Sequence, residues 1–376
     1  MRYSSLLLGL SLLAGTARGQ TAPADSVTTT VTSKRDKPSF IPIPVLFSQP
    51  ETGLGFGIAL LPVWRFGTDT LTRKSNARFI NWYTQKKQIL FQHTHSVFTP
   101  GEKYLLTGEA SYYYDFPINY YGFGPRTRRE DESGIKYKLL ILNERVLKKV
   151  VPNLFVGGQY RLTNIRDIEV TRNIDDTRPS LLLQRDARER QNTLVSGIGP
   201  ALLYDGRDNV LSAYHGNYLE LSALFNGGAL GSDYRFSRYL VDARHYQPLG
   251  SEKTIFASQL IGQFHTGDVP FRELANLGGD KIMRGYYEGR YRDRQLLALQ
   301  AEVRRYLFWR INGVLFGSVG QIGDTFADFD QGGVKAIGGA GIRLKFNRRD
   351  RLNIRFDYGV GRDGSKGFYF SFGEAF

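Results

Sequence analysis

Segments that alternate between apolar and polar residues are the feature of this chain that most restricts its fold. In residues 352–360, apolar or aromatic side chains occupy the even positions, and polar residues or glycine occupy the odd ones. Residues 334–346 largely repeat this pattern. Because successive side chains of a β-strand point to opposite faces, a period of two predicts strands with one apolar and one polar face.

About sixteen segments of this kind occur along the chain. Their approximate spans are 39–48, 53–66, 77–86, 88–98, 103–115, 135–148, 153–164, 192–205, 215–226, 234–246, 253–264, 294–308, 311–321, 333–347, 351–361 and 367–376. The long connections, 116–134, 165–191 and 265–293, all follow odd-numbered segments. An even strand number with long loops on one side only is typical of a bacterial outer-membrane barrel.

Two architectures can use such strands, a soluble sandwich and a transmembrane barrel. The polar faces here carry charges while aromatic residues gather at strand ends, which favours apolar faces toward lipid and polar faces toward a lumen. No stretch of eighteen apolar residues follows residue 19, which excludes membrane-spanning helices. The sequence therefore predicts an all-β fold, a transmembrane antiparallel β-barrel of about sixteen strands.

The N-terminal region predicts export. Residues 1–19 combine an early Arg2, an apolar run and small residues near Gly19, which is typical of a cleaved signal. Residues 20–38 show no periodicity and predict a disordered periplasmic leader, followed by the barrel at 39–376. The chain has no cysteine, which excludes disulfides and a lipid anchor on cysteine. The predicted location is the bacterial outer membrane.

The connection 266–293 contains the motif Met283-Arg284-Gly285-Tyr286. Arginine offers a planar fork of donors and keeps its charge, and glycine permits tight turns. Glu302 lies at an inward position of the following strand. Here the chain resembles the BamA/TamA-like surface-antigen family of outer-membrane barrels. The resemblance implies that the long loop folds into the lumen, where Arg284, Gly285 and Tyr286 form a lock with Glu302.

The family pattern implies a second inward carboxylate one strand later, within Phe-x-Asp-x-Gly. This sequence has Ser318 at that position, in Phe316-Gly317-Ser318-Val319-Gly320. Two interpretations stay open at this point. The lock is looser than in the family, or Asp357 on the strand 351–361 substitutes for the missing carboxylate.

Two further stretches carry the same resemblance. Residues 204–209, Tyr-Asp-Gly-Arg-Asp-Asn, are similar to a family turn between the eighth and ninth strands. The segment 367–376 resembles the closing strand that acts as a terminal signal. Alternation predicts one aromatic face there, made of Phe368, Phe370, Phe372 and Phe376.

The resemblance implies a role in outer-membrane biogenesis, the insertion or translocation of a protein or lipid substrate. The chain begins only about nineteen mature residues before its first strand, so we expect it to lack the periplasmic POTRA domains of full-length members. A different class, a structural or passive pore barrel with a plugged lumen, is the alternative. An outer-membrane enzyme ranks last.

No catalytic set, metal site or cofactor site is predicted. His93 and His95 lie two residues apart beside Ser96, but no third group can be assigned to them, and a lumen-lining or interface pair is favoured. The formal charge of +14 is spread over loops and inward faces, which does not favour nucleic acid as a partner. Outer-membrane lipids, lipopolysaccharide near Arg126, Arg128 and Arg129, and assembly partners are the expected partners.

Overall fold

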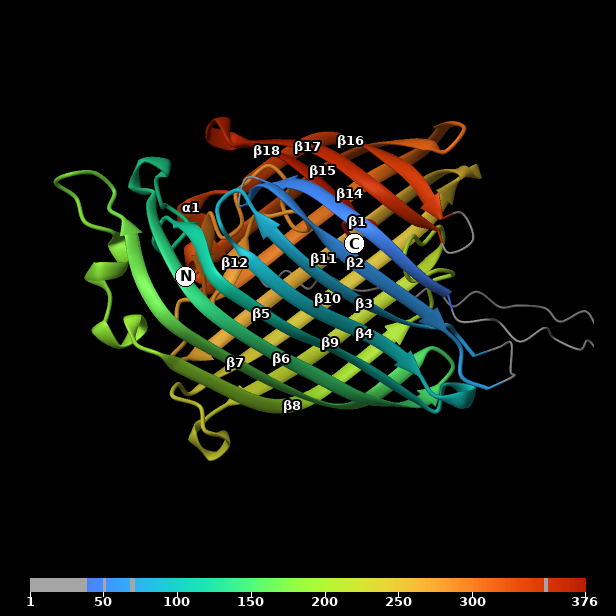
Figure 1. Cartoon of the computed structure of the whole chain (residues 1–376), viewed down its shortest axis with the longest axis horizontal. Helices are drawn as coiled ribbons and strands as arrows, with labels where there is room; N and C mark the ends of the chain where they lie inside the picture. The colour runs from blue at the N-terminus through green and yellow to red at the C-terminus, as the bar shows by residue number, and fades with distance from the viewer. Residues whose placement is uncertain (1–38, 50–51, 68–71, 348–350) are drawn as a thin grey trace, which may run out of the picture. The chain divides into compact units, whose positions relative to one another are not determined.

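Sixteen antiparallel strands form one sheet that curls into a barrel in the computed structural model (Figure 1). The structure describes residues 39–49, 52–67, 72–347 and 351–376. The predicted export signal, 1–19, and leader, 20–38, lie outside the described residues. Each strand of the large sheet is hydrogen-bonded to its neighbour in chain order. The predicted barrel of sixteen strands is confirmed.

The strands and helices have the following bounds. The barrel strands are β1 (Ser39–Gln49), β2 (Gly53–Trp64), β3 (Ser75–Thr84), β4 (Ile89–Phe98), β5 (Tyr104–Tyr120), β6 (Ser133–Val151), β7 (Leu154–Arg172), β8 (Thr193–Asp205), β9 (Gly216–Asn226), β10 (Phe236–Leu249), β11 (Ser251–Gly267), β14 (Gln295–Phe308), β15 (Ile311–Gly323), β16 (Lys335–Asn347), β17 (Leu352–Gly361) and β18 (Lys366–Phe372). A separate hairpin pairs β12 (Ala275–Leu277) with β13 (Tyr291–Asp293). The helical turns are Pro100–Glu102, Arg129–Asp131, Leu181–Gln184, Ala187–Arg190, Gly228–Leu230, Phe326–Asp328, α1 (Phe329–Gly332) and Arg362–Gly364. Across the described part of the chain, no helix has the length and apolar character needed to cross a membrane.

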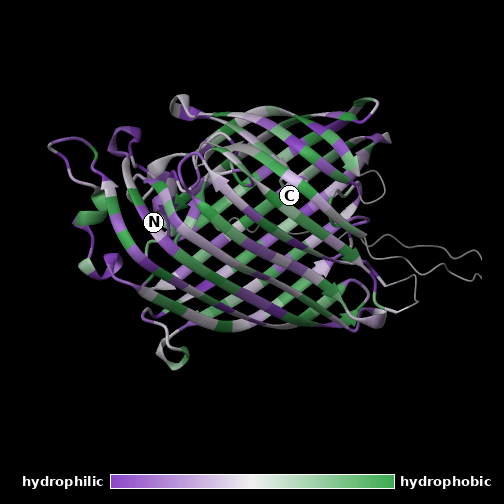
Figure 2. Cartoon of the chain, in the orientation of Figure 1, coloured by the Kyte–Doolittle hydropathy of each residue, from purple (hydrophilic) through white to green (hydrophobic). Residues whose placement is uncertain are grey.

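The two faces of the sheet differ as the alternation predicts (Figure 2). On β14, Leu297 and Leu299 are exposed, whereas Gln300 and Glu302 are buried. Long apolar side chains therefore cover the outside of the barrel, and polar side chains point inward. This arrangement suits an outer surface in contact with lipid.

Strands β5 and β7 extend well past their predicted ends, and β6 between them is longer by two or three residues at each end. Pairing continues to Tyr120 on β5, to Ser133 on β6 and to Arg172 on β7. Register shifts interrupt these ladders, for example between Tyr113 and Phe116. Such irregularities break the period of two, so the alternation stops before the hydrogen bonding does.

The end of the last strand departs from the prediction. The segment 367–376 is not one continuous strand, because β18 ends at Phe372 and Gly373 adopts a left-handed conformation with φ +79°. Phe376 is therefore not on the aromatic outer face. It is buried inside the barrel at 7% exposure, near Tyr246 and Ala257, and its carbonyl accepts a hydrogen bond from Arg304.

Glu374 supplies the physical reason for this turn. In a continued strand, its side chain would share the outer face with Phe368 and Phe372. A carboxylate facing lipid is strongly unfavourable. The turn at Gly373 instead places Glu374 inside, where its carboxylate accepts a hydrogen bond of 2.7 Å from Arg343 Nε.

The first and last strands, β1 and β18, lie side by side at the point where the sheet would close. Among the described residues no ladder joins these two strands, whereas all other neighbours along the sheet are laddered. Inward Ile43 and Val45 of β1 belong to one apolar cluster with Phe370 and Phe372 of β18. We call this junction the seam.

The connection between β8 and β9, residues 206–215, reaches across one end of the barrel. Asp208 pairs with Arg351, and Ser212 donates a hydrogen bond to Glu374 at 3.3 Å. Asp205 and Arg207 form a close ion pair at 2.9 Å that shapes the turn. The turn that resembles the family motif thus holds the end of the chain inside the barrel.

Candidate functional site

The candidate site lies on the connection between β11 and β14, residues 268–294, which we call the inner loop. Its apolar residues Leu277, Met283 and Tyr286 are fully buried. They pack in one cluster with residues of the wall, among them Leu296 of β14 and Phe316 of β15. The inner loop therefore lies against the inward face of the sheet.

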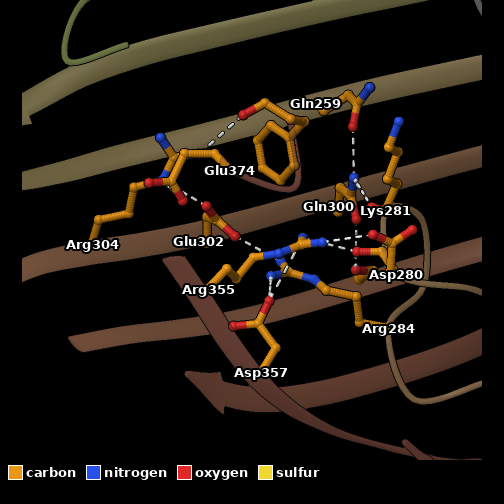
Figure 3. A network of polar contacts seen from close by, with 12 residues as sticks. Gln259, Asp280, Lys281, Arg284, Gln300, Glu302, Arg304, Arg355, Asp357 and Glu374 are labelled. Carbon is orange, nitrogen blue, oxygen red and sulfur yellow. Dashed lines mark hydrogen bonds and ion pairs between the residues drawn. The ribbon is translucent and has the colours of Figure 1, made fainter. Parts of the chain in front are cut away.

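Arg284 stands at the centre of this contact (Figure 3). Its Nη2 donates to Glu302 Oε2 on β14 at 2.6 Å, and its Nη1 donates to Asp357 Oδ2 on β17 at 2.6 Å. The three side chains are 0% exposed. The Arg284 guanidinium also lies 3.8 Å from the centre of the Phe316 ring. One loop residue thus binds three strands of the wall, with short charge-assisted hydrogen bonds to two of them.

The ion pairs continue beyond Arg284 into a set that we call the charge network, which is buried except for the partly exposed Asp280. Its members are Asp280, Arg284, Glu302, Arg304, Arg343, Arg355, Asp357 and Glu374. Four arginines face four carboxylates, so the formal charges cancel. Buried charges are tolerated only when paired and hydrogen-bonded, and this balance meets that requirement.

The second carboxylate illustrates how closely the network is connected. Asp357 Oδ1 accepts a hydrogen bond of 2.6 Å from Arg343 Nη1 on β16. Arg343 Nε in turn donates to Glu374 in the C-terminal segment at 2.7 Å. Arg284 is therefore linked through shared carboxylates to β14, β16, β17 and the end of the chain.

Two glycines allow the loop backbone to lie directly on β17. Gly285 has φ +129°, a conformation that residues with a Cβ rarely adopt. Opposite it, a Cβ on Gly359 would lie 2.2 Å from the carbonyl oxygen of Arg284, closer than atoms can approach. The absence of both side chains brings the loop within reach of Asp357.

Two tyrosines fix the tip of the loop next to the last strands. The Tyr369 hydroxyl on β18 accepts a hydrogen bond from Gly285 N at 3.1 Å and donates one to the Tyr286 carbonyl at 2.9 Å. The Tyr286 hydroxyl accepts from Arg362 N at 3.1 Å and lies 3.4 Å from the Ala336 carbonyl. The loop therefore contacts β18 itself, one side of the seam.

The two positions considered for the second carboxylate differ clearly in the structure. Asp357, on β17, takes the role of the second carboxylate, because its Oδ2 accepts a hydrogen bond from Arg284. Ser318 does not contact Arg284, and its hydroxyl lies 3.4 Å from Gln300 Oε1. Gln300 donates to the Lys281 carbonyl at 3.0 Å, so Ser318 supports the loop only through that side chain.

Several residues of the site were not singled out from the sequence. They are Phe316, Arg304, Arg343, Arg355, Tyr369 and Glu374. Most lie on the polar face of alternating strands, and that pattern could have marked Arg343, Arg355 and Tyr369 as inward. Glu374 carried no such signal, because alternation placed it on the outer face.

The histidine pair lies on the outside of the barrel. The ring of His93 stacks on exposed Phe79 at 4.3 Å, and His95 Nε2 lies 3.2 Å from Glu144 Oε2. These groups do not line the lumen. Within the described ranges, no three His, Cys, Asp or Glu residues are grouped to hold a metal ion.

Comparisons with known proteins agree with this architecture. A family model, the Omp85 superfamily domain, matches residues 64–376. The chain belongs to the Omp85 superfamily. The Omp85 assignment places this barrel in the bacterial outer membrane and confirms both the predicted location and the predicted BamA/TamA-like resemblance. It also agrees with the expectation that the chain is not an enzyme.

Solved structures show a similar fold. BamA from Haemophilus ducreyi lacking POTRA domains 1–3 has a TM-score of 0.57 at 12% identity, with 90% of this chain and 70% of that chain covered. CdiB from Acinetobacter baumannii has a TM-score of 0.55 at 13% identity, with 90% and 60% covered. No curated protein matches the sequence. At these identities the likeness concerns the fold alone.

Proposed function

We propose that this Omp85 barrel inserts or translocates a protein or lipid substrate at the outer membrane, and that the seam between β1 and β18 is where it acts. The observation that carries the proposal is the seam itself. Every other strand junction of the described sheet has a hydrogen-bonded ladder, but this one is held by an apolar cluster that includes Ile43 and Phe370. An unpaired strand edge can pair with an incoming strand by β-augmentation.

The inner loop is proposed to act as a lock on the lumen and on one side of this seam. Arg284, Gly285 and Tyr286 bind β14, β17 and β18, which form the C-terminal part of the wall. A wall braced in this way can stay ordered while β1 moves. The aromatic residues Phe368, Phe370 and Phe372 on β18 are proposed to be the terminal signal, without Phe376, which is inside.

Depletion of the protein in its native cell tests the proposed function. We expect lower amounts of other outer-membrane barrels or of surface lipids, measured by quantitative proteomics and lipid analysis of isolated outer membranes. Re-expression of the intact chain should restore them. Normal levels of both classes after complete depletion would falsify the biogenesis role.

The alternative, a structural or passive pore barrel with a plugged lumen, is favoured by the buried and charge-balanced lock. Normal barrel and lipid levels after depletion, together with a conductance that rises when the lock is removed, would support that function instead. The two functions therefore differ in the depletion result and share the conductance result.

Lipopolysaccharide as a specific partner stays a prediction. Arg126, Arg128 and Arg129 are exposed, but three acidic residues follow them directly at 130–132. Arg128 pairs with Glu130 at 3.0 Å, which reduces the positive charge available to phosphate. Binding of lipopolysaccharide that is unchanged when the three arginines are replaced by glutamine would remove this partner.

A further inference from the structure

Strand β1 carries two prolines, Pro42 and Pro44, in alternate positions of an edge strand. Both side chains are exposed, and the two residues pair with Leu60 and Ile58 of β2. Proline has no N–H, so its peptide group cannot donate to a ladder. What the prolines do therefore depends on whether these peptide groups point toward β2 or toward the seam.

Hydrogen bonds farther along the sheet settle this direction. Gln85 N donates to the Leu54 carbonyl at 2.7 Å, so the even-numbered residues of β2 bond β3. In antiparallel strands the peptide groups of successive residues point to opposite neighbours. The odd-numbered residues of β2 therefore bond β1, where Gly57 pairs with Val45 and Ala59 pairs with Ile43.

It follows that the even-numbered residues of β1 direct their peptide groups toward the seam. These positions are Phe40, Pro42, Pro44, Leu46 and Ser48. Two of the five, adjacent along the edge and at its centre, have no donor. A strand placed against this edge would find accepting carbonyls but would lose two consecutive N–H groups.

The edge of β18 differs. Gly373 N donates to the Asn353 carbonyl at 2.8 Å, and Gly361 N donates to the Ser365 carbonyl at 2.8 Å. The odd-numbered residues on this side thus bond β17. The even-numbered residues Lys366, Phe368, Phe370 and Phe372 direct their peptide groups toward the seam, and all four have an N–H.

The chemistry of β1 also accounts for the seam that the structure contains. A regular ladder between β1 and β18 would need donors from Pro42 and Pro44. Neither can donate, so two central bonds of such a ladder cannot form, and side-chain packing around Ile43 and Val45 joins the strands in the structure. Apolar packing is not directional, so such a junction can part without breaking a cooperative row of hydrogen bonds.

We propose that an incoming strand of a substrate barrel pairs with the free edge of β18, and that Pro42 and Pro44 close the free edge of β1 to such pairing. This inference rests on the proposed function of the seam. The occupant is an extended segment with alternating apolar and polar residues, because Phe368, at 48% exposure, continues the apolar outer surface on this side. Loss of two amide hydrogen bonds corresponds to roughly thirtyfold weaker pairing at β1.

Cross-linking at single cysteines tests the assignment, since the native chain contains none. The matched pair is Phe368→Cys on β18 and Leu46→Cys on β1, two exposed outward positions whose peptide groups face the seam. Val319→Cys on β15, exposed but on a fully paired strand, measures background. The full-length protein is placed in phospholipid vesicles with a ten-residue peptide of alternating valine and threonine carrying one cysteine, and a short thiol-reactive cross-linker is added.

We expect cross-linking at Phe368→Cys to exceed that at Leu46→Cys by roughly thirtyfold, with Leu46→Cys near the Val319→Cys background. Replacing both prolines, as Pro42→Ala with Pro44→Ala, should raise the Leu46→Cys yield toward that of Phe368→Cys. The matched control is Pro248→Ala near the end of the interior strand β10. If Leu46→Cys cross-links as strongly as Phe368→Cys, or more strongly, while both prolines are present, the assignment is wrong. It is also wrong if the yield at Leu46→Cys stays the same after both prolines are replaced.

This test is separate from the test of the proposed function. The peptide experiment measures which edge accepts a strand, and it needs no knowledge of the cellular substrate. If depletion lowers other barrels but the peptide prefers β1, the biogenesis function stands and the edge assignment is wrong. If depletion changes nothing while the peptide prefers β18, the biogenesis function is wrong and the edge chemistry stands.

Discussion

Arg284 shows how a single loop residue can hold a long connection inside a barrel. Its guanidinium bonds two carboxylates on different strands and covers the Phe316 ring, all without exposure to solvent. The free energy of such a contact depends on pairing, because an isolated buried charge is strongly unfavourable. Removing the arginine therefore leaves Glu302 and Asp357 without their shared partner.

We expect Arg284→Ala to destabilise the docked inner loop by about 3–5 kcal/mol, the usual effect of breaking a buried ion pair. Single-channel recordings should then show larger or more frequent openings than in the native protein. Arg294→Ala is the matched control, since Arg294 pairs with Asp324 in an exposed position. Identical recordings for Arg284→Ala and the native protein would contradict a lock at this residue.

Asp293, where the inner loop returns to the wall, should make the loop sensitive to pH. Burial raises the pKa of Asp293 to about 6, and the carboxylate of Asp324 acts in the same direction. Because the folded pKa lies above the ordinary value of 3.8, folding favours the protonated acid. This part of the loop is therefore expected to become more stable as pH falls from about 6 to about 4.

Hydrogen exchange of residues 290–294, corrected for the intrinsic rate at each pH, measures this effect. Protection should increase between pH 6 and pH 4 in the native chain and change much less in Asp293→Asn. An unchanged pH dependence in Asp293→Asn would assign the effect to another group, and a loss of protection on acidification would reverse the sign argued here.

At the level of elements, β17 is the strand that receives the inner loop. Its inward positions carry two charged residues, Arg355 and Asp357, followed by two glycines, Gly359 and Gly361. The charged positions bind the loop, and the glycines leave the space into which it fits. A Cβ on Gly361 would lie 2.8 Å from the ring of Tyr286, so both glycines serve the same contact.

Adding one methyl group to β17 tests whether the inner loop needs glycine at position 359 in order to dock there. Gly359→Ala should push the inner loop away from Asp357, because the new Cβ would overlap the Arg284 backbone. The expected destabilisation of the docked loop is about 1–3 kcal/mol, typical of overpacking. Protease cleavage within 278–290 should accelerate accordingly. Gly338→Ala on β16 should leave cleavage unchanged, since no atom lies within 4 Å of its added Cβ.

For the whole molecule, the contacts divide the barrel into a braced part and an unbraced edge. The inner loop, the charge network and the turn 206–215 all bind the region from β14 to the end of the chain. Among the described side chains of β1, Ile43 and Val45 meet that region in the apolar seam cluster. The two strands at the seam therefore differ in how firmly they are held. Strand β18 is bound by the inner loop, whereas β1 is an edge strand with two prolines.

Cysteine labelling would show whether the inner loop stays inside in the membrane. We expect Met283→Cys, at a fully buried position, to resist a membrane-impermeant maleimide added to whole cells. Thr177→Cys, in an exposed loop, should react quickly. Combining Met283→Cys with Arg284→Ala should increase its labelling. Equally fast labelling at positions 283 and 177 in the native background would show that the loop lies outside.

The sequence by itself determined the number of strands, their chain order and most of their faces. Alternation is a local property, since each residue's side depends only on its neighbours along the strand. Strands β3 and β4 depart from the regular alternation, because inward Ile80 and Trp82 are apolar while outward His93 and His95 are polar. In β3, the inward residues Ile80 and Trp82 are apolar because they pack against the apolar cluster at the seam.

The tertiary structure alone decided which groups meet. Asp357, 73 residues from Arg284, could be chosen over Ser318 only once the curvature of the sheet had brought β17 beneath the loop. The inward turn of Phe376 depended on Glu374 finding Arg343 and Arg304 inside the barrel. Ion pairing and strand closure join residues distant in the chain, so they follow from the closed sheet and not from any local pattern.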